Sequence, residues 1–161
     1  LVGGDGLMFL KSFSLGGGHI SADMCRVLNI SFAVAEELRK KINLNLQFEP
    51  SDHYILRDGT EIKAAQANEV AKARIQEIAE YIIACFDNYE NEINMSTPLF
   101  ITGGGLVYIK GAVELLSSFL KKRVAVAQTL DPMKNKPELA SAYGIAAIAV
   151  GHKSYKRKFG G

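Results

Sequence analysis

The chain has 161 residues, 48% of them hydrophobic and 22% charged, and a formal net charge of +2. These values are typical of a globular chain with enough apolar side chains for one core. No apolar run approaches the roughly 20 residues of a membrane-spanning helix, and the first residues lack the basic start of a signal peptide. Cys25 and Cys85 have no CxxC spacing, which argues against a disulfide framework or a zinc site and favours buried thiols in a reduced, cytosolic chain.

Basic residues are concentrated at the end of the chain. Residues 151–161 contain four bases and no acid, so the rest of the chain carries a net charge of −2. A body of this charge is not a basic nucleic-acid platform, and we expect no nucleic-acid partner. We expect residues 151–161 to be a solvated basic tail or linker, with contact to phosphates or an anionic membrane as the alternative.

The first third of the chain predicts one strand and two helices. Residues 7–13 have the pattern of a strand, and the glycines at 16–18 end it. From His19 to Asn29 apolar residues recur at helical spacing. A second helix is expected over residues 32–42, with Ser31 as its N-cap.

Turn and periodicity signals define the rest of the chain. The dipeptide Asp58-Gly59 predicts a hairpin, because it tolerates the positive φ angles of a tight turn. A long helix is expected over residues 66–93, since apolar residues recur there every three or four positions. The remaining expected elements are a buried strand, a helix, a second strand and a small-residue-rich helix able to pack against a sheet, at residues 99–102, 111–122, 124–127 and 137–150. This alternation favours an α/β fold, a sheet covered by helices, with residues 32–97 as an inserted α+β subdomain.

Two glycine triplets, at residues 16–18 and 103–105, each follow a predicted strand and precede helical sequence. In open α/β sheets, ligands bind beyond the carboxyl ends of strands, and glycine lets backbone N–H groups approach a nucleotide. Neither triplet fits the P-loop or the dinucleotide-binding pattern. A nucleotide site and a pair of plain tight turns therefore both remain open at this point.

Three segments resemble one known family. Residues 100–105, Phe-Ile-Thr-Gly-Gly-Gly, resemble the adenosine motif of actin-like ATPases. Residues 14–24 resemble the "GG-x-x-[ST]-x-D-[IL]" segment of the bacterial cell-division family FtsA, and residues 35–39 are similar to its "A-E-x-[IL]-K" helix. The segments occur in the family's order, and residues 140–150 fit its closing "A-x-G-x-A" helix. The resemblance covers nearly the whole chain.

This resemblance implies an actin-like (ribonuclease H-like) ATPase lobe, the C-terminal lobe of FtsA. Residues 1–31 and 98–150 would form subdomain IIA, on the adenosine side of the nucleotide. Residues 32–97 would form the inserted subdomain IIB, and residues 151–161 the basic tail. Other actin-like ATPases, of the pilus-assembly or plasmid-segregation type, are the alternatives within the superfamily.

The resemblance also implies an ATP site, bound as Mg-ATP in the full-length protein. The glycine turn would pack under the adenine and ribose, with a tyrosine placed to stack on the base, namely Gly103, Gly104, Gly105 and Tyr108. For Tyr108, an ordinary tyrosine at the surface or at the edge of the core is an equal alternative. Glu36 and Arg39 would reach the ribose and purine, with Arg39 standing where the family has Lys. From spacing alone, they are also an ordinary i,i+3 surface pair.

The phosphate half of such a site is not recognisable in this sequence. Residues 2–6 look like the hairpin turn just after the family's second phosphate loop, D-x-G-[GT]-x-[TS], and lack its Thr. We therefore assign no catalytic residue and no metal ligand. The full-length parent is expected to be a weak ATPase, and this chain alone is not expected to be catalytic.

Partners are likewise implied by the resemblance. Subdomain IIB of the family receives the C-terminal peptide of FtsZ, and Lys72 and Arg74 would offer it a basic face, with a pair between Arg74 and Glu77 as the alternative. The family also implies actin-like filaments and a cytoplasmic position at the inner face of the cell membrane, reached through segments absent from this sequence. A peptide-binding module that uses no nucleotide, and a kinase or chaperone of the same fold, are the competing hypotheses.

Overall fold

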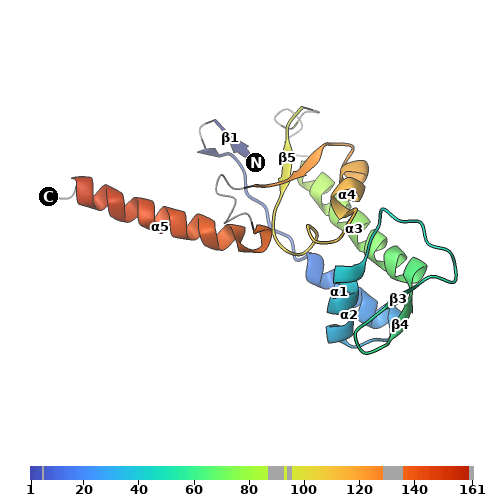
Figure 1. The fold of residues 1–161 in the computed structure, drawn as a ribbon. Helices are drawn as coiled ribbons and strands as arrows, with labels where there is room; N and C mark the ends of the chain where they lie inside the picture. The colour runs from blue at the N-terminus through green and yellow to red at the C-terminus, as the bar shows by residue number, and fades with distance from the viewer. Residues whose placement is uncertain (5, 87–92, 94–95, 129–135, 160–161) are drawn as a thin grey trace.

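The computed structural model of the chain describes residues 1–4, 6–86, 93, 96–128 and 136–159. Helices and short strands alternate along these residues (Figure 1). The strands are β1 (Val2–Gly3), β2 (Gly6–Leu7), β3 (His53–Ile55), β4 (Glu61–Lys63), β5 (Leu99–Ile101) and β6 (Val124–Val126). The helices are α1 (Gly17–Leu28), α2 (Phe32–Lys41), α3 (Ala64–Phe86), α4 (Ala112–Leu120), the 3₁₀ turn η2 (Pro137–Leu139) and α5 (Ala140–Phe159).

The strands pair two by two within the described residues. Strands β1 and β2 form one antiparallel hairpin, and β3 and β4 form another, in which Tyr54 lies opposite Ile62. Strands β5 and β6 are parallel, with Leu99 opposite Val124, and α4 connects them. A parallel pair joined through a helix is the βαβ unit of an α/β fold.

Helix α3 is the centre of the core, with α1 and α4 packed along it and α2 packed on α1 (Figure 1). Its apolar residues recur every three or four positions, so they form one buried stripe. Ile75 of this stripe is fully buried, together with Ile20 and Met24 of α1, Leu38 of α2 and Leu116 of α4. This packing fixes α1 and α2 beside the segment that follows β5.

Several local predictions are confirmed. Helix α2 begins after Ser31, whose hydroxyl accepts a hydrogen bond from the backbone N–H of Val34 at 3.4 Å. Asn29 ends α1 in the left-handed conformation, with φ of 54°. Gly59 has φ of 84° in the turn between β3 and β4, as the dipeptide Asp58-Gly59 predicted.

Other predictions differ from the structure. The strand expected over residues 7–13 is wrong beyond Leu7, because no strand among the described residues pairs with residues 8–13. Strand β5 is not buried on both faces, since Phe100 is 63% exposed. Helix α3 begins at Ala64, and the predicted extension over residues 87–92 lies outside the described residues. The two cysteines are free thiols and half-buried instead of buried.

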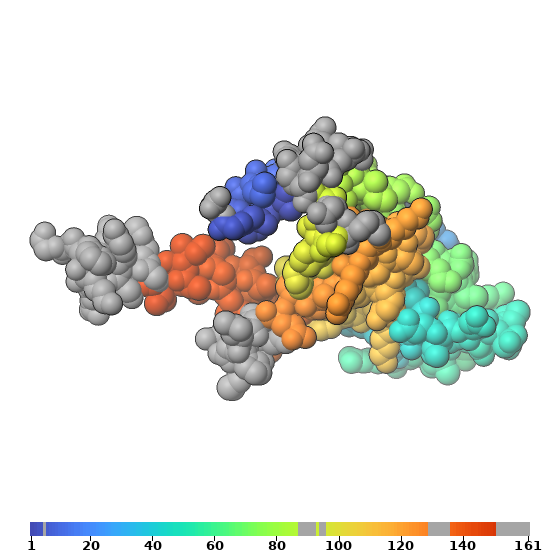
Figure 2. Space-filling view, turned by 90° about the horizontal axis from the view of Figure 1, so that it is seen from above, coloured from blue at the N-terminus to red at the C-terminus, as the bar shows by residue number. Residues whose placement is uncertain are grey.

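Helix α5 extends away from the body of the molecule (Figures 1 and 2). Ile145 and Ile148 are 70% and 74% exposed, so in the part of the chain that the structure describes this helix does not pack against a sheet as expected. Its backbone is helical through Phe159, so residues 151–159 of the expected basic tail continue this helix. Lysine and arginine are good helix formers, and the helix contains no proline to end it at Val150.

Candidate functional site

The two glycine triplets meet in the structure. A Cβ built on Gly17, at the start of α1, would lie 2.2 Å from the Cα of Gly105, which follows β5. Real Cβ atoms do not approach backbone this closely, so residue 17 must be glycine for this contact to form. The start of α1 is also capped by a side chain, because the backbone N–H of Gly16 donates to Nδ1 of His19 at 3.2 Å. His19 therefore acts as a capping residue.

The turn at residues 103–105, which we call the glycine turn, lies at the carboxyl end of β5. Gly103 has φ of 95°, in the region that favours glycine. Its N–H donates to the carbonyl of Pro137 at 2.9 Å, and the hydroxyl of Thr102 donates to the same oxygen at 3.2 Å. These bonds attach the glycine turn to the start of η2.

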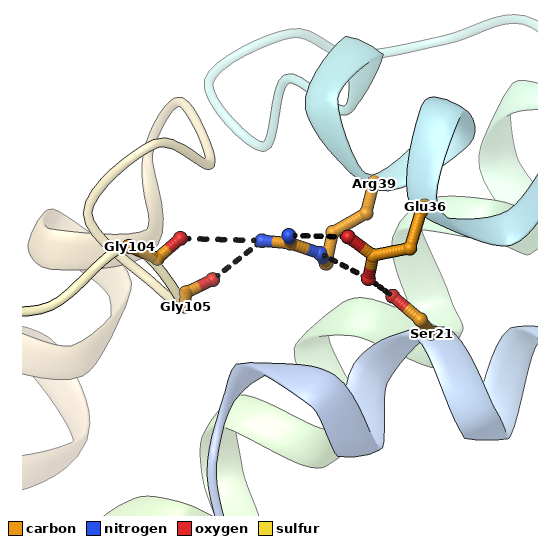
Figure 3. Close-up of polar contacts among 5 residues, drawn as sticks. All are labelled: Ser21, Glu36, Arg39, Gly104 and Gly105. Carbon is orange, nitrogen blue, oxygen red and sulfur yellow. Dashed lines mark hydrogen bonds and ion pairs between the residues drawn. The ribbon is translucent and has the colours of Figure 1, made fainter. Parts of the chain in front are cut away.

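Arg39 of α2 reaches across to the glycine turn (Figure 3). Its Nη1 donates to the carbonyl oxygens of Gly105 at 2.9 Å and Gly104 at 3.4 Å. Its Nε and Nη2 donate to the two carboxylate oxygens of Glu36 at 3.1 and 2.9 Å. The predicted pair is therefore more than a surface contact, since the Arg39 side chain is only 11% exposed.

Glu36 has a third partner that the sequence did not reveal. The hydroxyl of Ser21, a fully buried residue of α1, donates to its carboxylate (Figure 3). The hydrogen bond from Arg39 holds the pKa of Glu36 below its ordinary value, and the bond from Ser21 acts in the same direction. Glu36 is thus a fixed anion whose side chain is still 31% exposed.

Tyr108 lies over the glycine turn. A Cβ on Gly104 would lie 3.5 Å from the Cε2 of Tyr108 and 3.1 Å from the Cβ of Glu138. The Tyr108 hydroxyl donates to the Glu138 carboxylate, which raises the pKa of Tyr108 and lowers that of Glu138. Glu138 was missed in the sequence, although Pro137-Glu138 at a helix start is a recognisable signal.

Arg74 and Lys72 lie in different environments. Arg74 is 16% exposed and donates to both carboxylate oxygens of Asp23 on α1, at 2.6 and 2.8 Å. It also pairs with Glu77, the alternative that the spacing left open. Lys72 is 43% exposed and pairs with Glu69 at 3.3 Å.

A shallow pocket of about 340 Å³ lies beside Lys72, between the start of α3 and the loop that joins α2 to β3. Its lining combines apolar, amide and charged side chains: Leu46, Gln47, Phe48, Ala65, Asn68, Glu69 and Lys72. Elsewhere in the described part of the chain, no group of three or more His, Cys, Asp or Glu side chains could hold a metal ion. Nor does any helix found there have the length and apolar character needed to cross a membrane.

The fold and the comparisons with known proteins define the class: this is an α/β lobe of the actin-like ATPase fold, as the sequence predicted. A family model described as "Cell division protein FtsA" matches residues 1–144, so the chain belongs to the FtsA family of cell-division proteins. No curated protein matches the chain.

Among solved structures, the chain is similar to the ethanolamine utilization protein EutJ from Carboxydothermus hydrogenoformans, with a TM-score of 0.51 and 23% identity. The match covers 79% of this chain and 35% of that protein, so the chain spans about a third of the length of this neighbour. A likeness at this level of identity concerns the fold alone.

Proposed function

We propose that this chain is the adenosine-binding lobe of an FtsA-family cell-division protein and that it binds ATP at the glycine turn. The observation that carries the proposal is the position of this turn. It lies at the carboxyl end of β5, in a parallel β5–β6 pair, and faces the charged pair of α2. Ligands of open α/β sheets bind at this end of the strands.

In this proposal, each predicted residue has a defined role in holding the adenosine. The backbone of residues 103–105 packs under the adenine and ribose, because glycine leaves room for close approach. Glu36 accepts hydrogen bonds from ribose hydroxyls, since its carboxylate is ionised and partly exposed. Arg39 shapes the turn and lines the purine side, and Tyr108 offers its ring to the base. We assign no catalytic residue, and the magnesium accompanies the ATP phosphates.

We further propose that residues 1–31 and 98–150 form subdomain IIA and residues 32–97 subdomain IIB. The family assignment supports actin-like self-association and a peripheral, cytoplasmic position at the division site. Membrane attachment is assigned to no residue of this sequence.

The test is an ATP titration of the natural gene product that contains this chain. Gly104→Val should abolish measurable binding, because a side chain at Gly104 fills the space over the turn and pushes against Glu138. Gly144→Val is the matched control, since a Cβ at Gly144 meets nothing within 4 Å. Equal ATP affinity of the wild type and Gly104→Val would refute the site.

A second proposal concerns the partner. Lys72 stands at the rim of the 340 Å³ pocket beside Phe48 and the exposed Leu46, a combination of positive charge and apolar surface that suits an acidic, partly apolar peptide. We propose that the C-terminal peptide of FtsZ binds there. Arg74 contributes by holding α3 against α1, since its guanidinium is engaged by Asp23.

Peptide titration tests this second proposal. Lys72→Glu should weaken binding of the FtsZ peptide about tenfold, because it replaces attraction by repulsion at the rim. Lys11→Glu, at an exposed lysine outside the pocket lining, is the control and should leave the affinity unchanged. Unchanged affinity of Lys72→Glu would place the peptide elsewhere.

A further inference from the structure

We infer that Ser21 is a positioning residue for nucleotide binding, which acts through Glu36 and Arg39 on the glycine turn. The inference rests on the proposed ATP site and deepens it. Ser21 lies on α1 and has no contact with the turn itself among the hydrogen bonds of the described residues. Its effect must therefore pass through the carboxylate to which it donates.

The first step is the rigidity of Arg39. Its guanidinium is planar and donates in two directions at once, to the Glu36 carboxylate on one side and to the Gly104 and Gly105 carbonyls on the other (Figure 3). The position of Glu36 therefore determines where the guanidinium lies, and the guanidinium determines where the two turn carbonyls point.

The second step is the anchoring of Glu36. A glutamate on a helix surface has several rotamers, and its own neighbour Arg39 moves with it because both belong to α2. Ser21 is the contact that fixes this pair from a different helix. Since Ser21 is fully buried, its hydroxyl is shielded from water, and the hydrogen bond to Glu36 is the one that satisfies this donor.

The third step closes the ring. Gly17 of α1 touches the backbone of Gly105 directly, so α1 contacts the glycine turn at its first residue and Glu36 one helical turn further along, through Ser21. Contacts thus run from Gly105 through Arg39, Glu36 and Ser21 to α1 and back to Gly105. Such a closed set preorganises the turn, which lowers the ordering cost of binding a ligand.

A positioning role for Ser21 can be distinguished by experiment from the purely structural role of an ordinary buried serine. If it only filled space, its replacement would change stability and leave the affinity of the folded protein unaltered. If it positions Glu36, its replacement weakens nucleotide binding even where the protein is folded. The loss of one hydrogen bond to a charged group corresponds to about a tenfold weaker affinity.

The experiment is an ATP titration of the wild type, Ser21→Ala and Ser21→Cys in the natural gene product that contains this chain, with thermal unfolding to verify folding. Cysteine has the branching of serine with a somewhat larger sulfur and is a weak donor, so it serves if alanine leaves a harmful gap. We expect both variants to bind ATP about tenfold more weakly than the wild type. Tyr54→Phe is the control: it removes a half-buried hydroxyl that bonds Asn43 and Asn68, away from the turn, and should leave the affinity unchanged.

A double-mutant cycle with Glu36→Ala adds a readout that a structural role would not move. Once Glu36 is absent, Ser21→Ala should have no additional effect on the affinity. Wild-type affinity of folded Ser21→Ala or Ser21→Cys, or additive losses in the cycle, would overturn the inference while leaving the ATP site intact. Absence of ATP binding by the wild type would overturn the ATP site and this inference together.

Discussion

Replacing Arg74 by alanine should destabilise the protein strongly. The change removes two hydrogen bonds between the guanidinium and Asp23, of 2.6 and 2.8 Å, which join α3 to α1. The side chains of Arg74 and Asp23 are only 16% and 18% exposed, so the carboxylate left behind has little access to water. Removing one partner of a buried ion pair costs about 3–5 kcal/mol, and the residual exposure reduces our expectation to about 2–3 kcal/mol.

Urea unfolding measures this loss, because urea does not screen charges as guanidinium chloride does. A double-mutant cycle of Arg74→Ala and Asp23→Ala should give a coupling free energy of about 1.5 kcal/mol or more. The reason is that the double mutant has no unpaired Asp23 carboxylate, whereas Arg74→Ala alone leaves one with little access to water. Lys72→Ala is the control on the same helix. Its partner Glu69 is 74% exposed, so the cost should stay below about 0.5 kcal/mol.

Additive losses in this cycle would refute the interpretation. So would a loss for Arg74→Ala no greater than that for Lys72→Ala. Either outcome would mean that Arg74 is not engaged by Asp23 in solution, and would make its guanidinium available to a partner.

Two further predictions concern the glycine contact and the Glu36 carboxylate. Gly17→Ala should lower the free energy of unfolding in urea by more than about 2 kcal/mol, because the new Cβ meets the Gly105 backbone, which cannot rotate away. Gly18→Ala is the control and should be neutral or stabilising, since a Cβ at Gly18 meets nothing within 4 Å. Equal effects of the two substitutions would contradict the contact between Gly17 and Gly105. The pKa of Glu36 lies below its ordinary value of 4.5, so its contribution to stability is present above that pH and is lost as the pH falls through the lowered pKa. The stability difference between the wild type and Glu36→Gln should therefore shrink on acidification below about pH 4.5, and a difference that stays constant or grows would be inconsistent with the ion pair.

The sequence was sufficient wherever the determining interaction is local. Ser31 accepts a hydrogen bond from the N–H of Val34, three residues further on, and Asp58-Gly59 forms the short turn between β3 and β4. Both were therefore predicted correctly. Glu36 and Arg39 were singled out by family resemblance, and their mutual pairing by spacing. What Arg39 does across the molecule was not predictable, because the carbonyls that it contacts lie 65 and 66 residues further along the chain.

The errors have the same origin. Residues 8–13 have strand-like apolar character, but a strand needs a partner, and the pattern within one segment does not say whether it has one. The binding of a peptide by Arg74 was implied by the family resemblance and stays a prediction, but its contact with α1 was not foreseen. Its actual partner, Asp23, is 51 residues away and was not recognisable from periodicity.

The central claim is that the glycine turn binds the adenosine part of ATP, and hydrogen–deuterium exchange of the natural gene product with and without ATP tests it most directly. Binding should slow exchange in peptides covering residues 99–111 and 32–41, because the turn and the charged pair of α2 become ordered against the nucleotide. Peptides covering the pocket beside Lys72 serve as the internal reference and should exchange at the same rate in both states. Unchanged exchange across residues 99–111 at saturating ATP would contradict the account.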